Sequence, residues 1–222
     1  EKYLEVINRE PQKRITRYAA GIMGGTGFAV FFGCNVRDAI VALIVSVMIV
    51  AVGDWLAKRE SNLMVYNAIL SFISEVIIIV ALKMGVADHP DRIMIGIVML
   101  LISGLGTTNG IRDLLQRDFI SGFINIMNSF LGAAGIAFGI GLAIMLFHEG
   151  YSDHFILNHS VPIQLISCTV ACTGFAFWFK IRGKQVWYNS IGAFFTWAIY
   201  VVVFALKPSN FLATMIAAVF VA

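Results

Sequence analysis

The fold of this chain is decided by residues 93–115, which read IMIGIVMLLISGLGTTNGIRDLL. Within the segment from Ser103 to Gly110, three glycines and four hydrogen-bonding side chains interrupt an otherwise apolar helix. A helix from Ile93 to Ser103 rises about 15 Å, which is half the thickness of a bilayer core. Broken backbone at that depth is tolerated only inside protein or against a water-filled cavity. The segment therefore predicts a membrane-spanning helix that is broken near the midplane, and a close helix crossing through small residues is the alternative.

The composition around this segment is that of an integral membrane protein. Hydrophobic residues make up 59% of the chain and charged residues only 13%, whereas a soluble domain is about a quarter charged. Apolar blocks long enough for a helix to cross a bilayer recur along the chain. The expected spans are Ile15–Phe32, Val36–Leu56, Leu63–Leu82, Ile93–Leu115, Phe119–Phe147, Val161–Phe179 and Val186–Leu206, with an incomplete eighth at Phe211–Ala222.

The basic residues of the connections predict the orientation. Lysines and arginines are concentrated in the leading segment and in alternate later loops, which places the leading segment in the cytoplasm. The expected organisation is a cytoplasmic leading segment (1–17), a first five-span membrane repeat (18–147), an external loop (148–160) and an incomplete second repeat (161–222). The net charge is only +3, and the basic residues lie mostly at the ends of the apolar blocks. This pattern gives no reason to expect a nucleic-acid partner.

A repeat links the two halves of the chain. The segment from Thr26 to Phe32 recurs 147 residues later, from Thr173 to Phe179, and Ser61-Asn62-Leu63 recurs 148 residues later as Ser209-Asn210-Phe211. Both matches fall at equivalent places in the order of spans, so one repeat is five spans long. Because five is odd, the second copy enters the membrane the other way up. The predicted fold is an all-α polytopic bundle of inverted repeats, with seven to eight spans of ten present, an architecture common among secondary transporters.

The broken span also carries the candidate substrate-binding groups. A half-helix that restarts near Thr107 would present unpaired N–H groups and the positive end of a helix dipole to a carboxylate. Helical spacing places Thr108 beside Arg112, and Asn109 beside Asp113. Arg112 could bind a substrate carboxylate and Asp113 a substrate ammonium, while an interfacial charge cluster is the alternative for both. The candidate residues are Ser103, Gly104, Thr107, Thr108, Asn109, Arg112, Asp113 and Asn125.

Two other spans contribute candidates. Glu75 is the most isolated charge within a span, and a carboxylate there by default suggests function, so it is the candidate for proton coupling. Its alternative is a carboxyl group held by Ser71 without a role in transport. The fifth span has a seam of small and polar residues, in which Asn125 and Asn128 could line the inner part of a permeation path and the glycines are interpreted as helix packing. The seam comprises Ser121, Asn125, Asn128, Gly132, Gly135 and Gly139.

Residues 103–115, continued by Asp118-Phe119-Ile120-Ser121-Gly122, resemble the bacterial threonine/serine exporter family. In that family a Pro-Gly, a Thr-Asn, an Ile-Arg-Asp and a Ser-Gly occur in this order, and Ser103 here replaces the proline. The stretch from Val161 onward looks like the family's second conserved membrane region, fused to the first. The resemblance implies a ten-span, proton-driven exporter of the bacterial inner membrane with a soluble region before the spans. Related two-subunit members imply succinate-like dicarboxylates as alternative substrates.

The leading hypothesis is therefore proton-coupled export of threonine and serine by alternating access. The alternatives are a dicarboxylate exporter, which would need a second cation where the first hypothesis needs an anion, and a scaffold without transport. We expect no enzymatic activity, catalytic residue, metal or cofactor, because the spans contain no paired histidines, acidic metal motif or activated nucleophile. The expected partners are a small-molecule substrate, protons and the lipid bilayer, and a homo-oligomer is left open.

Overall fold

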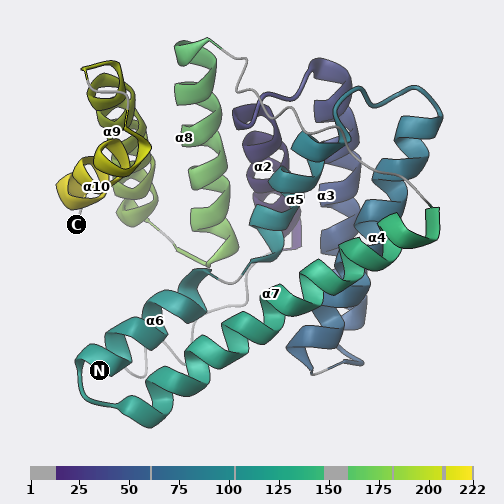
Figure 1. The fold of residues 1–222 in the computed structure, drawn as a ribbon, viewed down its shortest axis with the longest axis horizontal. Helices are drawn as coiled ribbons and strands as arrows, with labels where there is room; N and C mark the ends of the chain where they lie inside the picture. The colour runs from purple at the N-terminus through teal and green to yellow at the C-terminus, as the bar shows by residue number, and fades with distance from the viewer. Residues whose placement is uncertain are drawn as a thin grey trace.

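The computed structural model describes residues 14–60, 62–102, 104–147, 160–181, 183–206 and 209–221. None of these residues lies in a β-strand, so the predicted all-helical fold is confirmed. In chain order the helices are α2 (Arg14–Phe31), α3 (Val36–Leu56), α4 (Leu63–Lys83), α5 (Pro90–Leu101), α6 (Gly104–Leu115), α7 (Phe119–Phe147), α8 (Val161–Trp178), α9 (Lys184–Leu206) and α10 (Asn210–Val221) (Figure 1). Most of the leading segment and of the loop expected at 148–160 lies outside the described residues.

The described helices have the lengths and composition of membrane spans. Five of them, α3, α4, α7, α8 and α9, are long and apolar enough to cross a bilayer, and the bent pair of α5 and α6 makes a sixth. Helix α2 carries two arginines in its first turn and α10 has 12 residues, so neither is among the five. The chain is a polytopic helical membrane protein.

Polar and proline residues at the helix ends explain where the spans begin. Helix α3 begins after Asn35, whose side chain and that of Asp38 form a capping box. Helix α4 begins after Asn62, whose Oδ1 accepts hydrogen bonds from the N–H groups of Met64 (3.0 Å) and Val65 (3.5 Å). Proline in the first turn of α5 and of α8 has no N–H to leave unpaired. These signals fix the span boundaries to within a few residues.

Helices α2, α3, α4 and α5 form the core, and α8 packs along the other side of α2 (Figure 1). The core is filled by buried aliphatic side chains, including Val45, Leu70, Ile78 and Ile93. Helices α9 and α10 lie beyond α8, where α9 buries only Val186. Burial within the described residues is therefore concentrated in the first half of the chain.

Helices α2 and α8 cross in close contact because small residues meet at the crossing. A Cβ at Gly27 would lie 3.0 Å from Cα and Cβ of Ala171, and a Cβ at Gly174 would lie 2.5 Å from the backbone nitrogen of Gly24. These two contacts leave no room for longer side chains, so the two backbones approach each other directly.

Helices α6 and α7 form an antiparallel hairpin that projects from the core, and the second half of α7 crosses α4 (Figure 1). A Cβ at Gly135 would clash with the carbonyl oxygen of Met64, and one at Gly139 with Ser71 and the carbonyl oxygen of Ala68. The prediction that the glycines of this seam serve helix packing is confirmed.

Candidate functional site

The fourth span is broken, as its sequence predicts. Helices α5 and α6 are bent by 48° at the break that separates Leu101 from Gly104. Ile102 has an extended backbone conformation and its N–H still bonds the carbonyl oxygen of Val98 at 3.0 Å, so α5 ends here. Ser103, the first of the candidate residues, lies outside the described residues. A close helix crossing, which was the alternative interpretation, would need a continuous helix, and this span is not continuous.

The second half of the span begins earlier than expected. The predicted restart near Thr107 is wrong, because α6 already begins at Gly104. The N–H groups of a first helical turn have no acceptor within the helix, so the glycines at 104 and 106 can occupy that turn without losing backbone hydrogen bonds. Thr107 therefore closes the first turn, and Thr108 and Asn109 lie in the second.

The candidate polar residues of α6 lie on its exposed surface. Thr107, Thr108, Asn109 and Arg112 are all exposed, and the only buried residue of α6 is Gly110, which packs against α7. The Thr108 hydroxyl donates to the carbonyl oxygen of Gly104 at 3.1 Å. In a bilayer, a helix face with these groups is stable only beside water or another polar surface.

Asp113 joins the two helices of the hairpin. Its Oδ2 accepts hydrogen bonds from Ser121 Oγ at 3.1 Å and from Asn125 Nδ2 at 2.9 Å. Two candidate residues, Asp113 and Asn125, are thus brought together from different helices. Asn128, farther along α7, is exposed. Asp118 accepts a bond from the N–H of Ser121 at 3.2 Å, which places it as a cap at the start of α7.

Glu75 lies at the junction of three helices next to the break. Its side chain is 1% exposed and borders a cavity of about 10 Å³, close to the smallest volume that admits a water molecule. The cavity is lined from α4 by Ser71, Ser74, Glu75 and Ile78, from α5 by Met94, Ile97, Val98 and Leu101, and from α7 by Ile140. Because Leu101 is the last residue of α5, the buried carboxyl group and the broken backbone are neighbours.

A second buried carboxylate belongs to Asp38, at the start of α3. Among the described residues its sequence neighbour Arg37 forms no ion pair with it. Asp38 is 0% exposed, and it accepts hydrogen bonds from the N–H groups of Asn35 (3.1 Å), Asp88 (2.8 Å) and His89 (3.2 Å). His89 Nδ1 lies 3.0 Å from Oδ2 of Asp38. Arg37 lies 4.0 Å from Asp88 instead.

Arg92 and Cys34 complete this end of the core. Arg92 is buried and donates from Nη1 to the carbonyl oxygen of Gly33 at 2.5 Å, while its Nε has no hydrogen-bond partner among the described residues. Burial raises the pKa of the Cys34 thiol, the nearby Asp38 raises it further, and Arg92 partly opposes both. The one sequence signal for this cluster was the capping pattern Asn35-x-x-Asp38, which predicts the helix start but not partners from α5.

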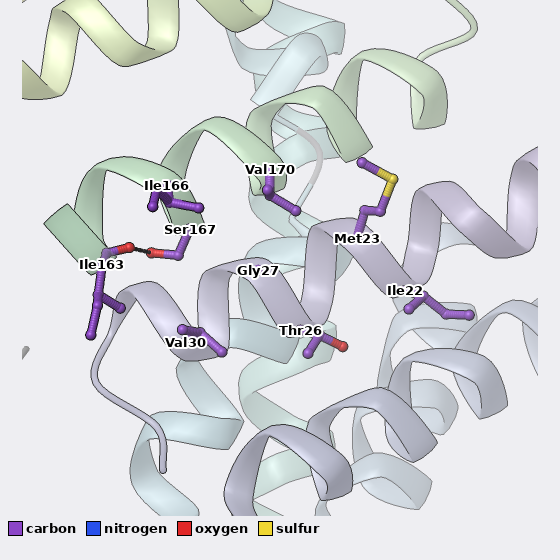
Figure 2. Close-up of a pocket in the computed structure, with 9 residues that line it drawn as sticks. All are labelled: Ile22, Met23, Thr26, Gly27, Val30, Ile163, Ile166, Ser167 and Val170. Atoms are coloured by element: carbon purple, nitrogen blue, oxygen red, sulfur yellow. Dashed lines mark hydrogen bonds between the residues drawn. The ribbon is translucent and has the colours of Figure 1, made fainter. Parts of the chain in front are cut away.

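A groove of about 400 Å³ lies between α2 and α8 (Figure 2). Its walls are aliphatic apart from Thr26 and Ser167, and the Ser167 hydroxyl already donates to the carbonyl oxygen of Ile163 at 2.7 Å. A zwitterionic substrate would find no charged partner in this groove. The break and the α6–α7 hairpin are therefore the better candidate site.

The fold and this site define a polytopic helical membrane protein with a broken span and a buried carboxyl group beside the break. Residues 1–147 match the family model for threonine/serine exporters. Residues 164–222 match a second model, described as "Threonine/Serine exporter, ThrE". The chain belongs to the threonine/serine exporter family, and the resemblance inferred from its motifs is confirmed.

A curated relative agrees with this assignment. A threonine/serine exporter of Corynebacterium glutamicum is 24% identical over 153 residues, which is 66% of this chain and 31% of the relative. The chain thus spans about a third of the length of the curated relative it matches. No solved structure matches the chain significantly.

Proposed function

We propose that this chain takes part in exporting threonine and serine across the membrane, coupled to the entry of protons. The observation that carries the proposal is the broken span, whose polar second half follows a break that borders the buried Glu75. A break of this kind frees backbone groups to hold a solute and is common at transporter substrate sites. Membership of the exporter family supports the same function.

In the proposed site, charge selects a zwitterionic amino acid. The Gly104 N–H already donates to the carbonyl oxygen of Ile102 at 3.1 Å, so the remaining N–H groups of the first turn of α6, together with Arg112, bind the substrate carboxylate. Asp113 binds the ammonium, and the bonds from Ser121 and Asn125 hold its carboxylate in one orientation. Asn109, which lies on the same side of α6 as Asp113, bonds the substrate hydroxyl, and Thr107, on another side of the helix, is the alternative partner. Thr108, whose hydroxyl proton is already donated to Gly104, can only accept from the substrate.

Glu75 is the proposed proton carrier. A carboxyl group buried between α4, α5 and α7, with Ser71 and Ser74 beside it, is expected to change protonation state when water reaches it or leaves it. Its position beside the end of α5 links that change to the conformation of the break. Proton binding and substrate release are thereby coupled through one set of helix contacts.

The crossing of α2 and α8 supports the inverted repeat, an architecture common among transporters that work by alternating access. At the offset of 147 residues found in the sequence, Gly27 corresponds to Gly174 and Gly24 corresponds to Ala171. The contact between Gly27 and Ala171 therefore has its counterpart in the contact between Gly174 and Gly24. Two helices related by a twofold axis would make this pair of contacts.

The proposed location is the inner membrane of a bacterium, with the leading segment in the cytoplasm, as the distribution of basic residues predicts. In this orientation the α6–α7 turn and the ends of α3 and α8 also face the cytoplasm.

Counterflow in proteoliposomes tests the proposed substrate. We expect labelled threonine and serine to exchange and labelled succinate not to exchange. Asp113→Asn should lower threonine exchange about tenfold, because the lost charge contact is worth about 1.4 kcal/mol or more. Asp118→Asn, in the next turn of the chain, is the matched control and should retain exchange within about twofold.

Other results would redirect the proposal. Exchange of succinate that survives Asp113→Asn would favour the dicarboxylate alternative. Absence of exchange for all three compounds would favour a scaffold without transport.

The proton role has a separate test. Glu75→Gln should abolish uphill threonine movement driven by a pH gradient while leaving counterflow measurable. Glu60→Gln, in the loop after α3, is the control. If the pH gradient still drives transport in Glu75→Gln, another group carries the proton.

A further inference from the structure

A second polar site lies away from the broken span, at the end of the core where α2 begins and α3 ends. An open pocket of about 490 Å³ is formed there between the two helices. Cationic and aromatic side chains dominate its walls, which include Arg14, Arg17, Tyr18, Asp54, Trp55 and Lys58. The transport proposal uses none of these residues.

The charges of this pocket do not cancel. Arg17 Nη1 lies 2.5 Å from Asp54 Oδ1, although this oxygen has no donor aligned for a hydrogen bond. The pair neutralises one arginine and holds it in place. Arg14 and Lys58 form no ion pair with any residue of the described ranges, and both are exposed. Among the described residues that line it, the pocket therefore has an excess of two positive charges.

Aromatic residues place the pocket at the level of lipid headgroups. Trp55 is 54% exposed on α3, and the Arg59 guanidinium lies 4.3 Å from its ring centroid. Tyr18 borders the pocket on α2. Tryptophan and tyrosine are enriched where the hydrocarbon core meets water. The pocket begins where the apolar parts of α2 and α3 end, so its cations face the polar surface of the bilayer.

We propose that this pocket binds a phosphate group, and that its occupant is the phosphodiester headgroup of an anionic membrane lipid. Clustered arginine and lysine side chains between membrane helices on the cytoplasmic side are suited to such headgroups. A guanidinium can donate two parallel hydrogen bonds to phosphate oxygens, and an ammonium adds a point charge. The open side of the pocket admits a headgroup whose acyl chains remain in the bilayer.

A structural role for these cations makes a different prediction. Lys58 and Arg59 follow the last turn of α3, where positive charge stabilises the carbonyl end of a helix. If that is their only role, removing Lys58 would weaken the helix end in any lipid, and no lipid would bind specifically. Lipid selectivity therefore separates the two roles.

The test uses the purified chain in neutral detergent. Its thermal midpoint is measured after addition of phosphatidylglycerol, phosphatidylcholine or inorganic phosphate, and native mass spectrometry counts the retained lipids. We expect phosphatidylglycerol alone to raise the midpoint and to remain bound. Arg14→Gln and Lys58→Gln should each weaken its binding about fivefold. Lys184→Gln, an exposed lysine at the start of α9, is the charge-matched control and should bind as the parent does.

Each outcome decides part of the proposal. Arg14→Lys, which keeps the charge, should retain binding and guards against a folding defect in Arg14→Gln. Equal effects of inorganic phosphate would overturn the lipid as occupant in favour of free phosphate. No effect of phosphatidylglycerol, or the same loss in Lys184→Gln as in the pocket variants, would overturn the phosphate site. Because no step measures transport, these results are independent of the exporter proposal.

Discussion

The two ends of helix α3 each place an aspartate at the edge of the core, but in opposite environments. Asp38, at the start of the helix, is fully buried and is surrounded by donors from its own cap and from the connection between α4 and α5. The side chain of Asp54, near the other end, is 28% exposed and contacts one arginine. Backbone N–H groups are fixed donors, so the carboxylate of Asp38 holds the start of α3 against the connection between α4 and α5. Asp54 leaves neighbouring cations available to a ligand.

The largest expected effect comes from removing the buried carboxylate. Asp38→Ala leaves the N–H groups of Asp88 and His89 without their acceptor in a partly buried place, so we expect a loss of about 2–3 kcal/mol in the free energy of unfolding. Denaturant unfolding in detergent measures this change. Asp38→Asn retains an oxygen for these donors and should cost clearly less. Equal losses in both variants would show that charge, rather than hydrogen bonding, stabilises this end.

Cys34 reports whether this end of the core is closed. In a Cys168→Ser, Cys172→Ser background it is the only thiol of the chain. Because burial raises its pKa, and Asp38 raises it further, the thiolate is scarce at neutral pH. We expect labelling by a maleimide to be at least about tenfold slower in the folded protein than in denaturant. Asp38→Ala should speed it up, whereas rapid labelling of the parent would contradict the closed end.

At the open end, the corresponding change should have a small effect on stability and a visible effect on binding. Asp54→Asn frees Arg17 from its ion pair with Asp54, and partly exposed pairs contribute about 0–1 kcal/mol. The added positive charge should strengthen phosphatidylglycerol binding about threefold, as measured by lipid titration. Weaker binding would mean that Asp54 positions Arg17 for the lipid rather than competing with it.

The smallest effect is expected at Arg37, beside the buried aspartate in sequence. Its side chain is 70% exposed and lies 4.0 Å from Asp88, so Arg37→Gln should change the free energy of unfolding by less than about 0.5 kcal/mol. The same denaturant experiment measures it and serves as the control for Asp38→Ala. A large loss would mean that the closed end depends on its surface charge.

Most of the fold could be predicted because span boundaries are local. Helices α3 and α7 begin and end at the predicted residues, since long, mostly apolar runs are bounded there by polar or charged residues. The break at Gly104 was also predictable, because glycines and hydrogen-bonding side chains are costly in the middle of a lipid-facing helix. Only the length of the break was overestimated, since the first turn of α6 tolerates glycine.

Contacts between distant segments could not be predicted in this way. The donors to Asp38 come from residues 88 and 89, and no local pattern indicates that the connection before α5 folds over the start of α3. Similarly, Asp113 and Asn125 were both candidates, but their hydrogen bond depends on how the α6–α7 hairpin closes. The cavity beside Glu75 requires three helices to meet. Sequence spacing supplied the chemical groups, and tertiary packing decided their neighbours.

The crossing of α2 and α8 has a consequence for how this molecule can vary. Gly24 and Gly27 lie one turn apart, and each meets a small residue of α8 through backbone contact. A methyl group added at Gly27 or at Gly174 would meet the backbone of the other helix and push that helix outward, together with the segments attached to it. At this crossing, a larger residue in one half of the chain cannot be accommodated without a change in the other half, because the two helix backbones are in direct contact.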